Sequence, residues 1–233
     1  MKRALLGALG VLGGALVVWA QEAGPIRVLE VHSEAYVQRG FEEAFIPLES
    51  GVRLSRLDAI ATGPQGRIVL DIEGRRLSLP PLAMLDLAAA RDVEPRAVLV
   101  GLERLRSRRL PSPQPVRLSR TALTRGSEAE SFPPSFSFDP LERAERRWRG
   151  LEALAEAGFW GSFVLEAKRL LEEVPELGER PERRLAVVAA MARVGLSGEA
   201  AQEFRSVLEA FGSTHRELLE RFLRQYGESL RLR

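Results

Sequence analysis

The chain has 233 residues, with 34 Lys and Arg against 32 Asp and Glu, and it contains no cysteine. The absence of cysteine excludes disulfides, thiolate metal sites and thiol nucleophiles. Two of the basic residues, Lys2 and Arg3, precede an apolar run, and the rest of the chain is formally neutral. Its overall charge therefore indicates neither a nucleic-acid partner nor a membrane surface.

The first twenty residues have the layout of a secretory signal peptide. Lys2 and Arg3 form a positive start, Ala4 to Val18 carries no charge, and Val18-Trp19-Ala20 resembles the site that a signal peptidase reads. We therefore expect a signal peptide over residues 1–20. An uncleaved anchor helix is the alternative, although a span needs about 20 apolar residues and this run is shorter and rich in glycine. Both interpretations predict an extracytoplasmic protein, periplasmic or secreted, that meets the membrane through this segment if it is uncleaved.

The spacing of apolar residues divides the remaining chain near residue 139. Before it, they recur at period two, which is typical of strands, and after it they recur at helical spacing. We predict an α+β protein of two domains, an all-β sandwich or roll over 21–130 and an all-α domain of helical hairpins over 139–233, joined by a linker at 131–138. The expected strands cover 26–31, 35–38, 52–54, 57–60, 68–72, 77–79, 84–87 and 97–102, with a hairpin turn at Glu73-Gly74.

The second domain is expected to hold about five helices. Asp139 is the predicted N-cap of the first, with Pro140 behind it and Gly158 at its end. Ser197 is the predicted cap of the fourth helix, and Thr214 that of the fifth. The second and third are expected at 163–174 and 183–194, the fourth at 197–211 and the fifth from 214 to about 227.

Turn residues recur within this second domain. Gly158 and Gly195 are 37 positions apart, as are Pro175 and Gly212. The spacing resembles that of tetratricopeptide-like helix pairs, whose period is about 34 residues. Such pairs stack into a concave surface that binds partner segments.

The motifs of common catalytic sites are missing from the sequence. It has no Walker-type phosphate loop, no G-x-S-x-G elbow and no H-E-x-x-H frame. The nearest approach to a metal site is "EVHSE", in which Glu30, His32 and Glu34 would share one face of a strand. A solvated polar face is the preferred interpretation, because three ligands on a flat strand diverge. We expect no metal, no cofactor and no enzymatic activity.

Two further groups keep alternative functions open. Asp58 and Asp71 are the aspartates nearest the patterned core of the β domain, and a cell-wall enzyme would need such a pair to converge. Asp58 is more simply explained as closing a turn. The arginines between residues 104 and 125 would suit an anionic envelope polymer, a glycan or a lipid head group, although solvation of loops explains them as well.

The stretch "LESGVRLSRLDAIATGPQGRIVLDIEGRRLSLPPLAMLDL", residues 48–87, resembles the FecR-type periplasmic domain. A second segment, "RTALTRGSE" at 120–128, is similar to the second signature of that family, with Ser127 in place of a threonine. Leu57 stands where a glycine usually precedes the aspartate. The residues that carry the match are Gly51, Leu54, Asp58, Ile60, Thr62, Gly63, Gly66, Leu70, Gly74, Leu79, Pro81, Arg125, Gly126 and Glu128.

The resemblance covers about residues 26–130 and implies an all-β, non-enzymatic, extracytoplasmic domain. Founding members of the family carry a cytoplasmic anti-sigma segment before the membrane, whereas Met1, Lys2 and Arg3 alone precede the apolar run here. We therefore do not expect direct signalling to transcription. The combination of this domain with helical pairs predicts an envelope scaffold or adaptor.

The expected partner is another envelope protein, and no nucleic acid is expected. Four aromatic residues cluster at the first helical hairpin. We expect Trp148 and Phe163 to lie in the core, whereas Phe159 and Trp160, at a helix junction, are the candidates for a protein-binding surface.

Overall fold

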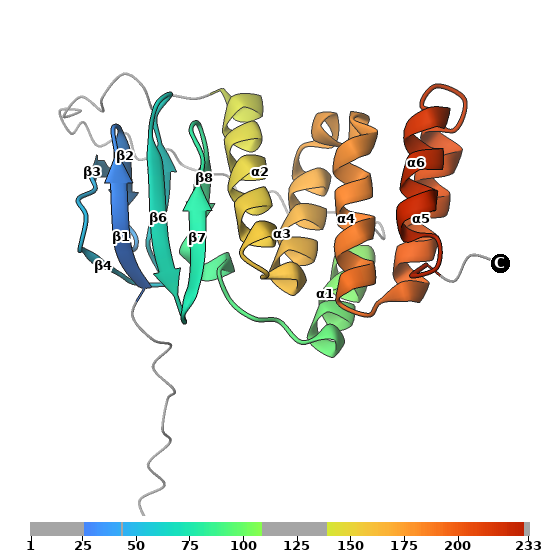
Figure 1. Cartoon of the computed structure of the whole chain (residues 1–233), viewed down its shortest axis with the longest axis horizontal. Helices are drawn as coiled ribbons and strands as arrows, with labels where there is room; N and C mark the ends of the chain where they lie inside the picture. Colours follow the sequence, from blue (N-terminus) through green and yellow to red (C-terminus); the bar gives the residue numbers. More distant parts are fainter. Residues whose placement is uncertain (1–25, 43, 109–138, 231–233) are drawn as a thin grey trace, which may run out of the picture.

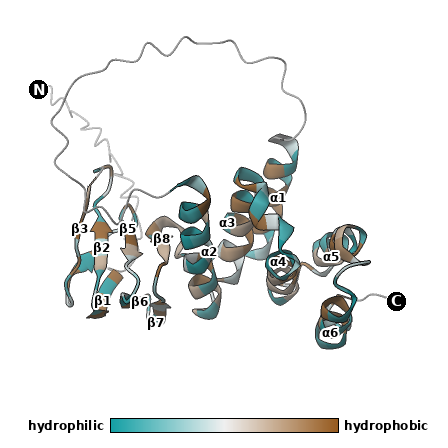
Figure 2. Cartoon of the chain, turned by 90° about the horizontal axis from the view of Figure 1, so that it is seen from above, coloured by the Kyte–Doolittle hydropathy of each residue, from teal (hydrophilic) through white to brown (hydrophobic). Residues whose placement is uncertain are grey.

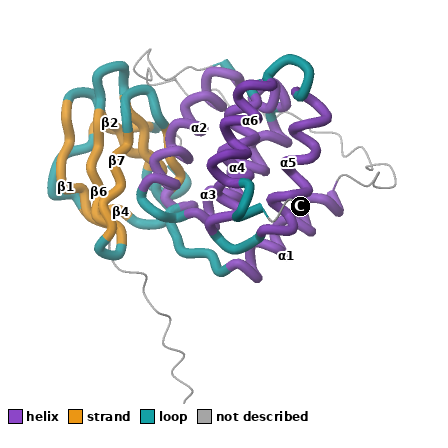
Figure 3. The backbone as a smooth tube through the Cα atoms, turned by 45° about the vertical axis from the view of Figure 1, so that its right-hand side comes forward, coloured by secondary structure: helices purple, strands orange, loops and turns teal. Residues whose placement is uncertain are grey.

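The computed structural model describes residues 26–42, 44–108 and 139–230. Strands form one end of the molecule and helices the other (Figures 1 and 3). The expectation of an α+β protein, β first and α second, is confirmed at this level. The expected signal peptide at 1–20, the expected linker at 131–138, Arg125 and Gly126 lie outside the described residues.

The β region consists of two four-stranded antiparallel sheets. The first has the order β4–β1–β6–β7, with the strands Arg53–Leu54, Ile26–His32, Arg67–Ile72 and Arg75–Leu79. The second has the order β3–β2–β5–β8, with the strands Phe45–Pro47, Ala35–Gln38, Ala59–Thr62 and Met84–Asp86. This architecture agrees with the expected sandwich or roll.

The alternation of side chains along β6 explains how the first sheet covers the core, although Val69 on the other face is buried as well. Ile68, Leu70 and Ile72 are fully buried, while Arg67 is exposed and Asp71 half-buried on the opposite face. A residue of β1 is left out of register between Val28 and Glu30, so the alternation shifts along that strand. The apolar face of the sheet is therefore continuous, and its polar side chains gather on the outer face.

The strand expected at 97–102 is wrong, because these residues belong to helix α1, Pro95–Arg108. A short apolar run cannot be assigned from periodicity alone. The neighbouring structure decides it here, since Val98 and Leu102, one helical turn apart, are buried and α1 packs on α3, Trp160–Glu173. A Cβ at Gly101 would lie 2.5 Å from a methyl group of Leu165, so the two helices approach closely there.

The region after residue 139 holds α2 (Pro140–Glu156), α3, α4 (Pro181–Arg193), α5 (Ser197–Phe211) and α6 (Arg216–Tyr226), with a 3₁₀ helix at Pro175–Glu179. The predicted cap at Asp139 is confirmed, since its carboxylate accepts hydrogen bonds from the amides of Leu141 and Glu142. Gly158 and Gly195 follow the ends of α2 and α4 with φ of 89° and 83°, which favour glycine. The helices form a row that leads away from the sandwich (Figure 2).

Two predicted caps are wrong. Ser197 is the first residue of α5, whose N-cap position is Leu196, without a side-chain hydrogen bond. The Thr214 hydroxyl donates to the carbonyl of Phe211 at the end of α5, and α6 starts two residues later at Arg216. In both cases the connection between the helices is short, and the next helix starts at another residue than the predicted cap implies, at Ser197 for α5 and at Arg216 for α6.

Helix α2 joins the two regions into one body. It packs on β7 and β8, and a Cβ at Gly150 would lie 2.0 Å from the carbonyl oxygen of Met84. The buried Arg146 donates from Nη1 to the carbonyl of Thr62 at 3.2 Å. One continuous apolar core runs through the sandwich and the helices. Among the described residues, no helix has the length and apolar character needed to cross a bilayer.

Candidate interaction surfaces

The carboxylate of Asp58 ties two loops of the sandwich together. It is 3% exposed and accepts hydrogen bonds from the amides of Ser55 and Gly40, at 2.9 and 3.0 Å, and from the guanidinium of Arg39 at 2.9 Å. Burial by itself would raise the pKa of Asp58, but these hydrogen bonds and the charge of Arg39 outweigh it and hold the pKa below its usual value. Every described contact of this carboxylate is structural.

Other residues of the family-like motif hold turns and close contacts. The buried Thr62 hydroxyl donates to the carbonyl of Pro80 at 2.6 Å and accepts from the amide of Ala83 at 2.9 Å. Gly63 faces Glu34 so closely that a Cβ would lie 2.0 Å from its carboxylate. Gly51 and Gly74 have φ of 82° and 81°, and Leu54 is buried. The motif therefore marks the scaffold of the sandwich.

The possible metal ligands do not converge. Glu30 and His32 lie on β1, 3.3 Å apart and largely exposed, whereas Glu34 follows the strand and lies beside Gly63. In the part of the chain that the structure describes, no group of three His, Cys, Asp or Glu side chains is placed to hold a metal ion. Asp58 and Asp71 also serve separate turns, since Asp71 accepts from the amide of Gly74.

The aromatic residues at the first hairpin are mostly buried. Trp148 and Phe163 are each 2% exposed and meet edge to face, as expected for core residues. The expected exposure of Phe159 is wrong, because it is 1% exposed and lies under the guanidinium of Arg75, 4.8 Å from the ring centre. Trp160 is half-buried, with Arg193 4.4 Å above its ring. The ring of Phe159 is therefore covered, whereas Trp160 keeps part of its surface exposed.

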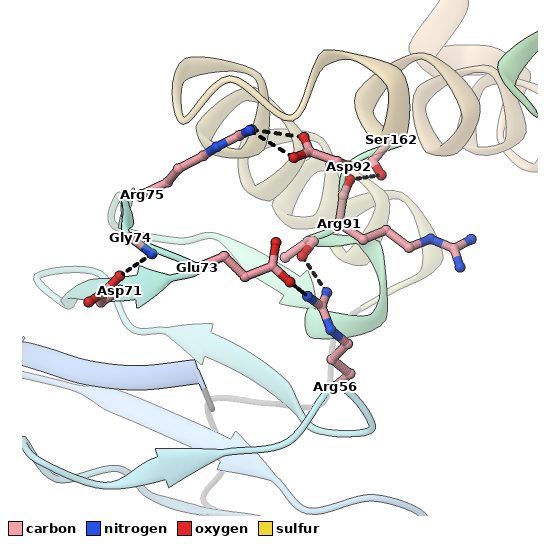
Figure 4. A network of polar contacts seen from close by, with 9 residues as sticks. Arg56, Asp71, Glu73, Gly74, Arg75, Arg91, Asp92 and Ser162 are labelled. Atoms are coloured by element: carbon pink, nitrogen blue, oxygen red, sulfur yellow. Dashed lines mark hydrogen bonds and ion pairs between the residues drawn. The ribbon is translucent and has the colours of Figure 1, made fainter. Parts of the chain in front are cut away.

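A polar network links the sandwich to the start of α3 (Figure 4). Arg75 makes two hydrogen bonds to Asp92, at 2.9 and 2.7 Å, and the Ser162 hydroxyl donates to the carbonyl of Arg91 at 2.6 Å. Arg56 bonds to Glu73 and to the backbone of residue 90. The guanidinium of Arg91 extends away from this network (Figure 4). These contacts fix the segment before α1, and the guanidinium of Arg91 takes no part in them.

A groove of about 710 Å³ lies beside this segment, along α1. Val93, Ala97, Val100 and Leu165 give it an apolar lining, and Val100 is 48% exposed. The wall includes Gly101, which lets α1 approach α3. The groove thus presents apolar surface that no described residue covers.

Arginines surround this groove, which we call the α1 groove. Within the described parts of the chain, the guanidiniums of Arg91, Arg96 and Arg104 make no hydrogen bond or ion pair. Of the two acidic residues in the lining, Asp92 is already bound by Arg75, which leaves Glu94. The groove therefore combines apolar surface with an excess of uncompensated positive charge.

Sequence reasoning misses most of this groove. A strand at 97–102 would point Ala97 and Val100 to opposite faces, whereas the helix places them on one face together with Arg96 and Arg104. In the sequence, Arg104 stands out only as part of a basic stretch. The spacing of Arg96, Val100 and Arg104, four residues each, is the sequence pattern that points to a shared helical face.

Two other hollows hold charged side chains that are mostly paired with one another. One of about 530 Å³ contains Glu203, which binds Lys168 at 3.0 Å and Arg184 at 3.3 Å. Burial by itself would raise the pKa of Glu203, but the charges of Lys168 and Arg184 outweigh it and lower the pKa. The other, of about 290 Å³, is lined by Arg147 and Arg169, which share Glu173, and it also borders Arg91 of the α1 groove. Arg147, Arg169, Arg184 and Lys168 therefore have internal partners, unlike the arginines of the α1 groove.

No family model, curated protein or solved structure matched the chain.

Proposed function

We propose that this protein is a non-catalytic interaction protein of the cell envelope, in which a FecR-like β platform carries a tetratricopeptide-like helical module. Its partner is another envelope protein, bound through the α1 groove. The observation that carries the proposal is the apolar groove of about 710 Å³ with three arginines that lack partners among the described residues. The partner is a segment with apolar and acidic side chains, since those groups complement this surface.

The way the groove is supported favours binding over catalysis. The segment before α1 is clamped by Arg75, Ser162 and the close approach of Gly161 to Val93, so the groove is preorganised. A preformed site loses less conformational entropy when it binds a partner. Its side chains supply charge and apolar area, and the carboxylates discussed above serve turns and ion pairs.

The first prediction tests the groove by crosslinking and affinity. A photoreactive phenylalanine analogue in place of Val100 should crosslink one envelope protein in the native cell, and mass spectrometry would identify the crosslinked segment. Arg96→Glu combined with Arg104→Glu should weaken binding of that segment at least about tenfold, because two attractive charges become repulsive. Raising the ionic strength should weaken wild-type binding as well.

A matched control separates this site from general charge effects. Arg221→Glu changes an exposed arginine on α6 and should leave the affinity unchanged. Crosslinks to segments without acidic residues, or equal losses with Arg221→Glu, would contradict the assignment of the groove. If a soluble anionic polysaccharide competes for the same arginines, the ligand of the groove would be an anionic polymer instead of a protein.

A further inference from the structure

Several turns at one end of the sandwich gather where the described chain begins. The antiparallel registers place the start of β1 at Ile26, the turn after β2, the turn between β4 and β5 and the β6–β7 hairpin at the same end. Figure 1 shows this end at the bottom of the view, where the chain enters β1. We call it the entry end.

The entry end carries the two most exposed large apolar side chains among the described residues. Phe41 is 93% exposed and Leu57 is 62% exposed. Each is next in sequence to a residue of the hydrogen bond between the Gly40 amide and Asp58, 3.0 Å long, so the two loops are held side by side. The Leu57 amide also donates to the Ser55 hydroxyl at 3.0 Å. The loops thus form a fixed apolar tip.

A row of arginines crosses the outer face of the first sheet close to this tip. The strand registers pair Arg53 with Arg27, Arg27 with Asp71, and Asp71 with Arg76. The three arginines are exposed, and within the described residues their guanidiniums make no hydrogen bond or ion pair. Like charges directly opposite one another destabilise a strand pair. An external anion would relieve the repulsion between Arg27 and Arg53.

Most of the acidic groups at the entry end are already engaged. Asp58 is bound by Arg39, Glu73 by Arg56 and Asp92 by Arg75. Asp71 accepts the amide of Gly74 within its hairpin, and Glu42 remains exposed beside Phe41. The hydrogen bond from Gly74 leaves the charge of Asp71 in place, and the registers put Asp71 between Arg27 and Arg76. Among the described residues at the entry end without an ion pair, Arg27, Arg53 and Arg76 therefore stand against Asp71 and Glu42, which leaves a small excess of positive charge at Arg27 and Arg53.

We propose that the entry end docks on an anionic membrane surface, with Phe41 and Leu57 inserted among the lipid head groups and Arg27, Arg53 and Arg76 facing the phosphates. Apolar tips with adjacent cations are suited to the membrane interface. The proposal does not depend on the α1 groove.

The sequence before the entry end selects a membrane as the occupant. The apolar run ends at Val18, and seven residues separate it from Ile26. Seven extended residues reach at most about 25 Å. The tether joins the described body at the entry end, so an embedded apolar run would hold this end within that distance of the bilayer. Once the run is cleaved, the tip and the arginines maintain the contact.

The test uses the chain from Gln21 onward, which retains every described residue, because the apolar run would itself bind lipid. The sequence has no cysteine, so Phe41→Cys or Leu57→Cys allows one environment-sensitive fluorophore to be attached. With vesicles of phosphatidylcholine and phosphatidylglycerol, we expect a blue shift and quenching by lipid-borne nitroxides. A label at Leu141→Cys, 44% exposed at the start of α2, should show neither effect, because α2 begins at the top of the view in Figure 1, away from the entry end at the bottom.

The arginine row is tested by vesicle co-sedimentation of the unlabelled protein. Arg27→Gln combined with Arg53→Gln should lower the partition coefficient about thirtyfold, which corresponds to about 1 kcal/mol for each arginine near an anionic surface. Pure phosphatidylcholine vesicles should bind weakly. Three results would overturn the proposal. The first is an equal fluorescence change at positions 57 and 141, and the second is vesicle binding that does not depend on the content of anionic lipid. The third is binding of a soluble anionic glycan without any fluorescence change at positions 41 and 57.

Discussion

The carboxylate of Asp58 contributes to the stability of the sandwich. Its hydrogen bonds to Ser55, Gly40 and Arg39 join the turns that precede β5 and follow β2. The pKa of Asp58 is lower in the folded protein than in the unfolded chain. The ionised carboxylate therefore stabilises the fold above a pH of about 4, and this contribution is lost as the pH falls through the lowered pKa.

We accordingly predict that Asp58→Asn lowers the free energy of unfolding at neutral pH by about 1.5–3 kcal/mol, the range for hydrogen bonds to a charged group. The difference from the wild type should shrink in acid, when the wild-type carboxylate becomes protonated. Urea unfolding at several pH values measures this difference in the free energy of unfolding. Glu49→Gln, an exposed residue, is the control, and a difference that stays constant with pH would contradict the role of the ionised form.

At the scale of elements, the contact of α2 with β8 requires a glycine. The backbone of α2 comes so close to the strand that a Cβ at Gly150 would lie 2.0 Å from the Met84 carbonyl oxygen. Gly150→Ala should therefore lower the stability by about 1–3 kcal/mol, because the helix must move off the strand.

Gly198 provides the matched control for this change. It lies in α5, and no atom of a neighbouring residue lies within 4 Å of the position that a Cβ would take. Gly198→Ala should therefore leave the stability unchanged or raise it by up to about 1 kcal/mol. Thermal unfolding of the two variants measures the contrast. Equal behaviour would mean that α2 adjusts its position without cost.

At the scale of the whole molecule, sandwich and helices share one core. Arg146 bonds to Thr62, Arg75 to Asp92, and the buried side chains form a single cluster across the junction. A continuous core of this kind couples the two parts, whereas domains joined by a small polar interface move independently.

We predict a single unfolding transition for both parts. Leu85→Ala, in β8, should lower the stability by about 2–5 kcal/mol. It should also shift the midpoint reported by the fluorescence of Trp148 on α2, measured with Trp19 and Trp160 replaced by Phe. Hydrogen exchange in β6 should report the same loss. Two separate transitions, with Trp148 insensitive to the change in β8, would show that the parts fold independently.

Local patterns are sufficient for much of the fold. Alternation over 68–72, the glycine after Glu73 and the cap at Asp139 each depend on nearest neighbours along the chain, and the structure has the predicted strand, hairpin and helix start there. The buried core positions Trp148 and Phe163 also follow from helical spacing. These features are determined by short stretches of neighbouring residues.

The sequence by itself therefore determined the order of β and α regions and most element positions, because periodicity reports which face each segment buries. Tertiary structure alone decided that residues 97–102 are helical, that Phe159 is covered by Arg75, and that Arg27 lies opposite Arg53. These outcomes depend on contacts between segments distant in the chain. Both proposed surfaces, the α1 groove and the entry end, depend on such contacts. The local spacing of Arg96, Val100 and Arg104 points to one helical face of the groove, but the groove itself forms only where α1 packs on α3.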